Sequence, residues 1–166
     1  MIGNEIHQFA QKLWPINRSL TGYGVRETLR KISEHLPKLK IRSVPSGTEV
    51  FDWNVPKEWS VKEGYIITPS GEKICDFSKN NLHLVGYSVP FEGNLNFAEL
   101  KKHLHTIPDK PKAIPYLTSY YKETWGFCLS QEQFDTLENG TYKVVINSTL
   151  FDGELNYGEL FLKGKC

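Results

Sequence analysis

The sequence predicts a mixed α/β protein, α+β in arrangement, with N-terminal helices, a β-rich middle and a terminal β-hairpin. Apolar residues recur at helical spacing over the first 36 residues, which is typical of amphipathic helices. The 13 glycines and 9 prolines suggest many turns, and hence short strands in the middle of the chain. Near the C-terminus, Asp152-Gly153 separates two apolar runs, which is a strong hairpin signal. This order of elements indicates α/β or α+β.

Length and composition narrow the functional classes. A chain of 166 residues with 39% hydrophobic and 23% charged residues is typical of a soluble globular domain with its own core. A net charge of +1 gives no reason to expect nucleic acid or an anionic membrane as partner. No apolar run approaches the roughly 20 residues of a membrane span, and the N-terminus does not resemble a secretory signal. Three widely spaced cysteines argue against a disulfide framework. We therefore expect a cytoplasmic protein.

Two helices are expected first. Apolar residues at helical spacing predict a helix over residues 3–13, which Trp14-Pro15 ends because a residue before proline avoids the α region. A second helix follows the loop Asn17–Gly24. Its expected buried stripe is Val25, Leu29, Ile32 and Leu36, with an exposed Glu27–Lys31 pair, and Pro37 closes it.

Short strands and turns should follow. We expect strands at Ile41–Val44 and Thr48–Trp53, then a hairpin of Tyr65–Thr68 and Lys73–Phe77 around Pro69–Glu72. Leu82–Val89 reads as a further strand, buried on both faces.

The last third combines two short helices with two strands. Asn96 with Glu99, and Ser130 with Gln133, have the spacing of capping boxes. The first helix should turn Phe97, Leu100 and Leu104 inward, and the second Phe134 and Leu137. Thr141–Asn147 and Leu155–Leu162 should then pair as the terminal hairpin.

The stretch Ile114–Ser130, IPYLTSYYKETWGFCLS, has neither helical nor strand periodicity and carries five aromatic residues. It reads as a packed, specialised connection. Its aromatic rings could line a pocket for a sugar or a peptide, or they could close a small β core; the sequence favours neither interpretation. If a pocket exists, Tyr120, Tyr121 and Trp125 are the residues that we expect to line it.

Other candidate sites are weaker. His83, His103 and His105 lie near one another in sequence without a zinc motif, so solvated or locally bonded roles are favoured over metal ligation. Cys128 precedes a capped helix, but a buried, inert thiol is the better interpretation, and Cys75 and Cys166 are weaker candidates. The loop Asn17–Gly24 lacks both common phosphate-binding patterns, so a structural turn is favoured. No catalytic residue and no metal ligand can be assigned from these patterns.

Three blocks nonetheless resemble a known family: LWPINRSLTGYGVRETL, IPYLTSYYKETWGFCLS and GTYKVVINSTLFDGELNYGEL. Together with VPSGTEVFDWNVPKEW and NNLHLVGYSVP, they are similar to an aminopeptidase-like family related to the M28 zinc peptidases, of DUF4910/DUF2172 type. The resemblance covers nearly the whole chain.

The resemblance implies a domain organisation. Residues 1–55 would open an M28-like peptidase domain, residues 56–112 would form an inserted β-rich subdomain, and residues 113–166 would return to the peptidase domain. The terminal hairpin would then belong to a peptidase-like sheet. Genes of this family often lie beside genes for surface-polysaccharide biosynthesis, so the substrate need not be a simple peptide.

The resemblance also implies zinc in the full-length family, but its zinc-ligand motifs do not fall within these residues. We therefore expect no zinc in this chain alone and no hydrolysis by it. Its partner would be the remainder of the peptidase domain, or a second copy joined through an exposed sheet edge. The alternative function is a non-catalytic binding or interaction module in a polysaccharide-biosynthesis context, with carbohydrate as the candidate ligand.

Overall fold

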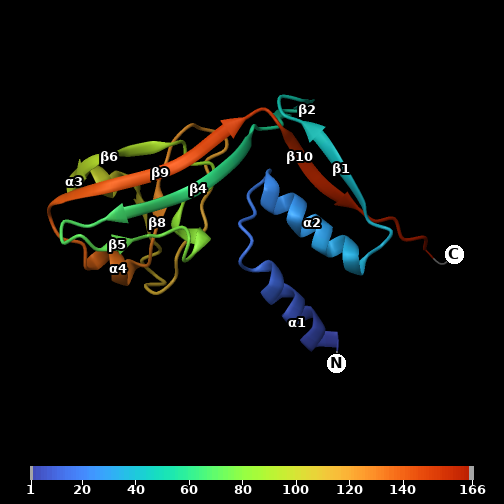
Figure 1. The fold of residues 1–166 in the computed structure, drawn as a ribbon, viewed down its shortest axis with the longest axis horizontal. Helices are drawn as coiled ribbons and strands as arrows, with labels where there is room; N and C mark the ends of the chain where they lie inside the picture. Colours follow the sequence, from blue (N-terminus) through green and yellow to red (C-terminus); the bar gives the residue numbers. More distant parts are fainter. Residues whose placement is uncertain (1, 165–166) are drawn as a thin grey trace. The chain divides into compact units, whose positions relative to one another are not determined.

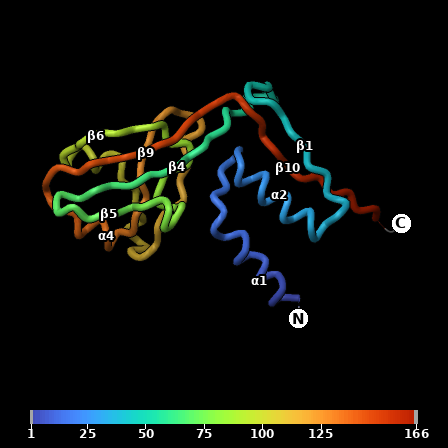
Figure 2. The backbone as a smooth tube through the Cα atoms, in the orientation of Figure 1, coloured from blue at the N-terminus to red at the C-terminus, as the bar shows by residue number. Residues whose placement is uncertain are grey.

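The computed structural model describes residues 2–164 and confirms a mixed α+β fold. The chain forms two compact units: unit 1 comprises residues 1–60 and 150–166, and unit 2 comprises residues 61–149. Figure 1 labels their elements, and Figure 2 traces the backbone through each. None of the helices in the described range is long and apolar enough to cross a membrane.

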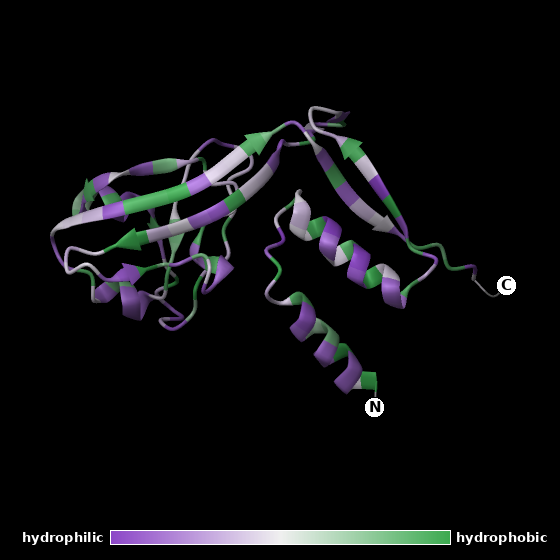
Figure 3. Ribbon diagram, viewed as in Figure 1, coloured by the Kyte–Doolittle hydropathy of each residue, from purple (hydrophilic) through white to green (hydrophobic). Residues whose placement is uncertain are grey.

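Both expected helices are present in unit 1. Helix α1 spans Ile2–Leu13 and α2 spans Tyr23–His35, so they end before the predicted prolines. The predicted Glu27–Lys31 pair forms, with the Lys31 ammonium 3.4 Å from the Glu27 carboxylate, but both side chains are half-buried and not exposed. Figure 3 shows polar and apolar residues alternating along α2. The predicted buried stripe of α2 is only half-buried, and Leu36 is 41% exposed. Within the described chain, this stripe is therefore incompletely covered.

Unit 1 contains two small antiparallel sheets. Strand β1, Lys40–Pro45, pairs with β10, Glu154–Glu159, from Lys40↔Glu159 to Pro45↔Glu154. Strands β2, Glu49–Val50, and β3, Trp53–Asn54, form a tight hairpin. The single strand predicted over Thr48–Trp53 is therefore wrong: Phe51 adopts φ 54°, in the left-handed region, and reverses the chain there.

Unit 2 is built on a four-stranded sheet of order β5-β4-β9-β6. Its strands are β4, Glu58–Ile67; β5, Lys73–Ile74; β6, Phe91–Asn96; and β9, Thr141–Phe151. The predicted hairpin at residues 65–77 is confirmed, because Ile66 pairs with Ile74 and Ile67 with Lys73. Strand β6 was not predicted, since its sequence FEGNLN is rich in glycine and asparagine, which are weak strand formers.

The predicted terminal hairpin is wrong. Strand β10 pairs with β1, whereas β9 lies between β4 and β6. The turn at Asp152-Gly153 exists, but its backbone bonds elsewhere. Gly153 N–H donates to the Ser46 hydroxyl at 3.1 Å, and Ser46 N–H donates to the Gly153 carbonyl at 2.9 Å. These bonds guide β10 toward β1, so the turn connects two different sheets.

The predicted strand over Leu82–Val89 is also wrong, although half of its residues are buried. Residues Asn81–His83 form a 3₁₀ turn, η1, followed by isolated bridges Leu84↔Phe127 and Gly86↔Thr118. Tyr87 has φ 66°, a conformation that interrupts a regular strand. The predicted burial holds for Leu84, Val85, Tyr87 and Ser88, whereas the backbone path depends on distant partners.

The two short helices begin directly after the capping residues that the sequence indicated. The Asn96 side chain accepts from Glu99 N–H at 3.0 Å and Glu99 accepts from Asn96 N–H at 3.4 Å, which confirms the capping box of α3, Phe97–Leu100. The Ser130 hydroxyl caps α4, Gln131–Asp135, by accepting from Gln133 N–H at 3.1 Å. The turn η2, Lys101–His103, follows α3, and β7, Leu104–His105, pairs in parallel with β8, Phe127–Cys128. Leu100 and Leu104 are buried, although Leu104 lies on β7 and not on the helix.

Candidate functional site

The aromatic stretch 114–130 lies in unit 2 along the irregular segment 84–89. Gly86 N–H donates to the Leu117 carbonyl at 2.9 Å, and Val89 N–H donates to the Thr124 carbonyl at 3.0 Å. At Gly86, a Cβ atom would lie 3.2 Å from the Thr118 hydroxyl oxygen, which shows how closely the two segments approach. Backbone contacts therefore hold the aromatic residues in place, as a packed connection requires.

Trp125 stacks on two rings of the same unit. Its ring centroid lies 3.7 Å from that of His103 with the planes 5° apart, and 4.3 Å from that of Phe91 with the planes 23° apart. The His103 Nδ1 lies 3.0 Å from the Trp125 carbonyl oxygen; because a carbonyl only accepts, Nδ1 is the donor. Trp125 is half-buried. It contributes to packing, and its role in ligand contact stays a prediction.

Tyr120 and Tyr121 lie together, with ring centroids 4.2 Å apart, and Tyr120 also meets the edge of buried Tyr87 at 5.9 Å. Tyr121 is 78% exposed, so its ring is accessible. The hydrogen bond with Tyr121 is the main cause that raises the pKa of Tyr120 above its usual value. Among the three predicted pocket residues, the structure thus brings the two tyrosines together, whereas the ring partners of Trp125 are Phe91, His103 and Phe127.

Two of the three candidate histidines are hydrogen-bonded to backbone carbonyls of the stretch 114–130. The His83 Nδ1 donates to the Cys128 carbonyl oxygen at 2.8 Å, just as His103 donates to Trp125. Burial, with a smaller effect of His103, lowers the pKa of His105 and favours its neutral form. Among residues 2–164, no group of three histidine, cysteine or acidic side chains is arranged to hold a metal ion.

The cysteines of unit 2 are free and buried. Burial raises the pKa of both the Cys128 thiol and the Cys75 thiol to about 12. A thiol with so high a pKa is almost fully protonated at neutral pH and is a poor nucleophile. Burial agrees with the inert interpretation of both residues, which stays a prediction, and Cys166 lies outside the described residues.

The loop Asn17–Gly24 belongs to unit 1 and acts as a turn between the two helices. The Arg18 guanidinium donates to the Leu13 carbonyl at 2.7 Å, and Gly22 adopts φ 97° just before α2. At Gly24, a Cβ atom would lie 1.8 Å from the Asn17 carbonyl oxygen, so only glycine allows this approach. The close packing supports the structural interpretation of this loop.

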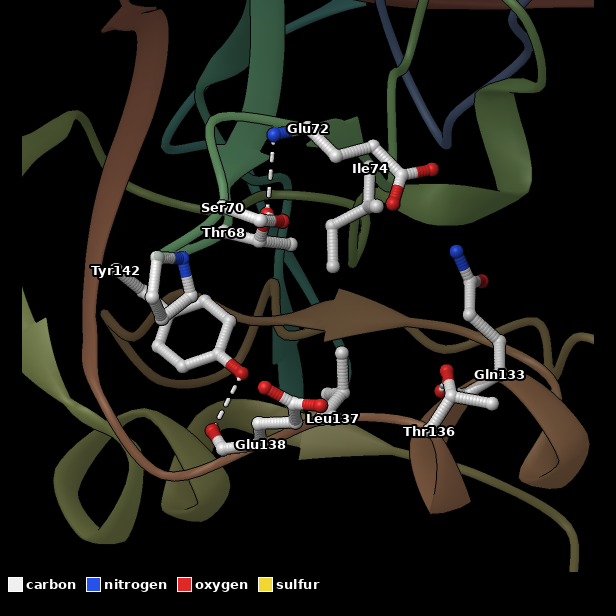
Figure 4. A pocket seen from close by; sticks show the side chains of 10 residues that line it. Thr68, Ser70, Glu72, Ile74, Gln133, Thr136, Leu137, Glu138 and Tyr142 are labelled. Atoms are coloured by element: carbon white, nitrogen blue, oxygen red, sulfur yellow. Dashed lines mark hydrogen bonds between the residues drawn. The ribbon is translucent and has the colours of Figure 1, made fainter.

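A second candidate site in unit 2 is a pocket of about 340 Å³ between the β4–β5 hairpin and α4 (Figure 4). The side chains that define it come from both sides: Thr68, Glu72 and Ile74 from the hairpin, and Gln133, Leu137 and Glu138 from the helix and its exit. Tyr120, Tyr121 and Trp125 do not line it. The sequence indicated both the hairpin and the capped helix, but it carried no signal that they face one another.

Two contacts fix the walls of this pocket. The buried Tyr142 hydroxyl donates to the Glu138 carbonyl at 2.7 Å and holds the chain after α4. At Gly140, a Cβ atom would lie 2.4 Å from Pro69 Cγ, so the absent side chain lets the hairpin tip approach the start of β9. The pocket is therefore preformed by its scaffold.

Comparison with known proteins places the chain among relatives that are longer than it. It is 53% identical over 98% of its length to a Clostridium acetobutylicum protein provisionally named "polysaccharide biosynthesis protein with aminopeptidase-like domain". A crystal structure of a proposed peptidase from C. acetobutylicum has the same identity, a TM-score of 0.91 and the same coverage of this chain. The chain spans only 37% of the curated relative and 38% of the crystallised chain.

The family match lies in the middle of the chain. Residues 58–149, more than half of the sequence, match the family described as "Domain of unknown function (DUF2172)". This range closely follows unit 2, residues 61–149. Sequence identity, shared fold and family match agree, and the chain therefore belongs to the DUF2172 family.

Proposed function

We propose that this chain is the N-terminal portion of an aminopeptidase-like metallohydrolase related to the M28 peptidases, of DUF4910/DUF2172 type, and that it is inactive alone. The observation that carries the proposal is the 53% identity over 98% of the chain to a relative whose name includes an aminopeptidase-like domain. The proposed organisation keeps the peptidase domain at residues 1–55 and 113–166, with residues 56–112 inserted; its boundary between residues 112 and 113 lies inside compact unit 2, residues 61–149. Free Cys75 and Cys128 support a reducing, cytoplasmic location.

Zinc is the cofactor that this family resemblance implies. A catalytic zinc needs about three protein ligands and an open position for water. The described residues do not fit such a site, because no group of three suitable donors occurs among them. We therefore propose that the ligands for zinc lie in the remainder of the family protein, and we assign no catalytic step to residues of this chain.

The proposed partner is that remainder, or else a second copy of the chain. Unit 1 supports this in two ways. Its β1–β10 sheet has two strands in the described range, so each strand has an unpaired edge. Ile6 on α1 is 64% exposed, and α1 buries none of its residues. Edges and apolar stripes of this kind are commonly covered by further chain.

The test compares this 166-residue chain with the full-length C. acetobutylicum relative, measuring bound zinc and hydrolysis of leucine p-nitroanilide. We expect the relative to bind zinc, to hydrolyse the substrate and to lose this activity with a chelator. The short chain should neither bind zinc nor hydrolyse the substrate. Stoichiometric zinc in the short chain would contradict our assignment of the metal ligands. A zinc-free relative would contradict the metallohydrolase proposal.

A second function is favoured by one observation, the exposed Tyr121 ring beside Tyr120. We propose that Tyr120, Tyr121 and Trp125 contact a carbohydrate in a non-catalytic binding module, because exposed aromatic faces stack on sugar rings. Tyr121→Ala should then weaken binding of an oligosaccharide without changing the melting temperature. Tyr116 offers a matched control, since Tyr116→Ala removes a ring that is also exposed but lies outside the proposed contact set.

A further inference from the structure

We propose that the pocket between the β4–β5 hairpin and α4 binds a neutral, hydroxyl-rich ligand the size of one or two sugar units. The inference goes beyond the function proposed above. It shares the carbohydrate class with the second proposed function but none of its residues, so the two can fail separately.

The size and the walls of the pocket suit a small ligand. Its volume of about 340 Å³ lies at the lower end of the range of roughly 300–1,000 Å³ that is typical of small-molecule sites. Figure 4 shows the aliphatic side chains of Ile74 and Leu137 directed toward one another, with the polar ends of Glu72 and Gln133 directed to the same space. Aliphatic walls beside polar groups match a sugar ring, which has both C–H and O–H surfaces.

The hydroxyl groups of the pocket are already engaged within the protein. Thr68 Oγ1 accepts from Glu72 N–H at 3.0 Å and lies 2.8 Å from the Ser70 hydroxyl. The Thr136 hydroxyl donates to the Gln133 carbonyl at 2.7 Å. These bonds shape the walls and leave recognition to the longer side chains.

Three longer side chains remain available. In the part of the chain that the structure describes, neither the Glu72 nor the Glu138 carboxylate forms an ion pair, and the Gln133 amide forms no hydrogen bond. Two carboxylates and an amide offer mostly acceptor atoms. A ligand that satisfies them must supply several donors, and sugar hydroxyls do so without adding charge.

The charge of the pocket determines which sugars we expect it to bind. Among residues 2–164, no lysine, arginine or histidine lines the pocket, whereas two glutamates do. A sugar that carries a carboxylate or a phosphate would meet two like charges and no compensating cation. The pocket should therefore accept glucose and N-acetylglucosamine and reject glucuronate.

The experiment is an NMR titration of the ¹⁵N-labelled 166-residue chain with glucose, N-acetylglucosamine, glucuronate and ethanolamine. We expect both neutral sugars to shift the amide signals of Glu72, Gln133 and Glu138, and glucuronate to leave them unchanged. Glu72→Gln and Glu138→Gln should each weaken binding by about five- to tenfold, because each removes a charge-assisted hydrogen bond. Glu132→Gln on α4 is the matched control, since it makes the same change of charge outside the pocket and should bind as the unchanged chain does.

Several results of this titration would overturn the proposal. Equal binding of glucuronate would show that charge does not select the ligand, and shifts with ethanolamine alone would show simple attraction of a cation. Shifts at Tyr121 with none at Glu72 would remove the pocket from carbohydrate binding and support the aromatic contact set instead. No shift with either sugar would overturn the pocket as a sugar site, while zinc binding by the full-length relative would stand as a separate result. The dispersion of the amide signals in each variant confirms that it is folded.

Discussion

Arg26 and Glu58 form a bidentate ion pair within unit 1. Nη1 of Arg26 lies 2.7 Å from Oε1 of Glu58, and Nη2 lies 3.0 Å from Oε2. Oε1 also accepts from Glu154 N–H at 3.0 Å, and Nη1 also donates to Asn156 at 3.2 Å. One buried carboxylate therefore connects helix α2, the beginning of β4 and strand β10.

Arg26→Met should lower the free energy of unfolding by about 1–3 kcal/mol, because it leaves the buried charge of Glu58 without its guanidinium. Urea unfolding followed by circular dichroism measures the change. Arg30→Met is the matched control on the same helix: Arg30 is exposed and solvent screens its ion pairs with Glu27 and Glu34, so its loss should be smaller than that of Arg26→Met. Equal losses in the two variants would contradict a special role for Arg26.

The same carboxylate predicts a pH dependence. Burial acts to raise the pKa of Glu58, but the hydrogen bonds from Arg26 and from Glu154 N–H outweigh it, and the pKa is lowered. The folded state thus binds this proton less readily than the unfolded state does. The stabilisation is fully present above the unfolded-state pKa of about 4.3 and is lost as the pH falls through the lower folded-state pKa.

Glu58→Gln should therefore be less stable than the unchanged chain at neutral pH, and the difference should shrink as the pH falls from about 5 to about 3. Melting temperatures measured across this range provide the test. The melting temperature of the control Glu132→Gln should change with pH in the same way as that of the unchanged chain. A Glu58→Gln difference that stays constant with pH would contradict the lowered pKa.

Trp125→Ala should destabilise unit 2 by about 1–3 kcal/mol, because it removes a half-buried ring that stacks on Phe91 and His103. Tyr121→Ala removes an exposed ring and should change stability by less than about 0.5 kcal/mol. Thermal unfolding of both variants decides between these roles. If Trp125→Ala melts at the same temperature as the unchanged chain yet loses ligand binding, the ring contacts the ligand and does not stabilise the packing.

Gly140→Ala should destabilise unit 2 by about 1–3 kcal/mol, since the added methyl group would meet the Pro69 ring at 2.4 Å. Gly164→Ala is the control, because a Cβ atom there meets nothing within 4 Å. Chemical unfolding of the two variants measures the difference. An unchanged stability for Gly140→Ala would mean that the hairpin tip moves freely away from β9.

Local sequence signals predicted much of this fold. The Asn96–Glu99 capping box and the Pro69–Glu72 hairpin turn depend on residues within four positions of one another, and both are confirmed. The glycine at position 153 correctly indicated a turn. It did not indicate which strand would pair with β10, because that depends on Ser46 and Glu58, far away in the chain.

Prediction of the candidate sites had the same limit. The aromatic stretch was recognised from its composition, but the stacking of Trp125 on Phe91 and His103 joins three separate segments. Tyr87 gave no sign of its positive φ, which is uncommon for an aromatic residue. The pocket escaped prediction because Thr68 and Gln133 come close only when the hairpin and α4 are both in place.

Strands β4 and β9 are neighbours in the sheet of unit 2, and Figure 1 shows them running in opposite directions. The first and last residues of the unit, Val61 and Thr149, lie on these two strands, one near the start of β4 and the other near the end of β9. Its two ends are therefore close together, as they are in domains that tolerate insertion or circular permutation. A unit of this kind can be inserted, deleted or exchanged in a single genetic event. It can also be engineered into a surface loop of another protein.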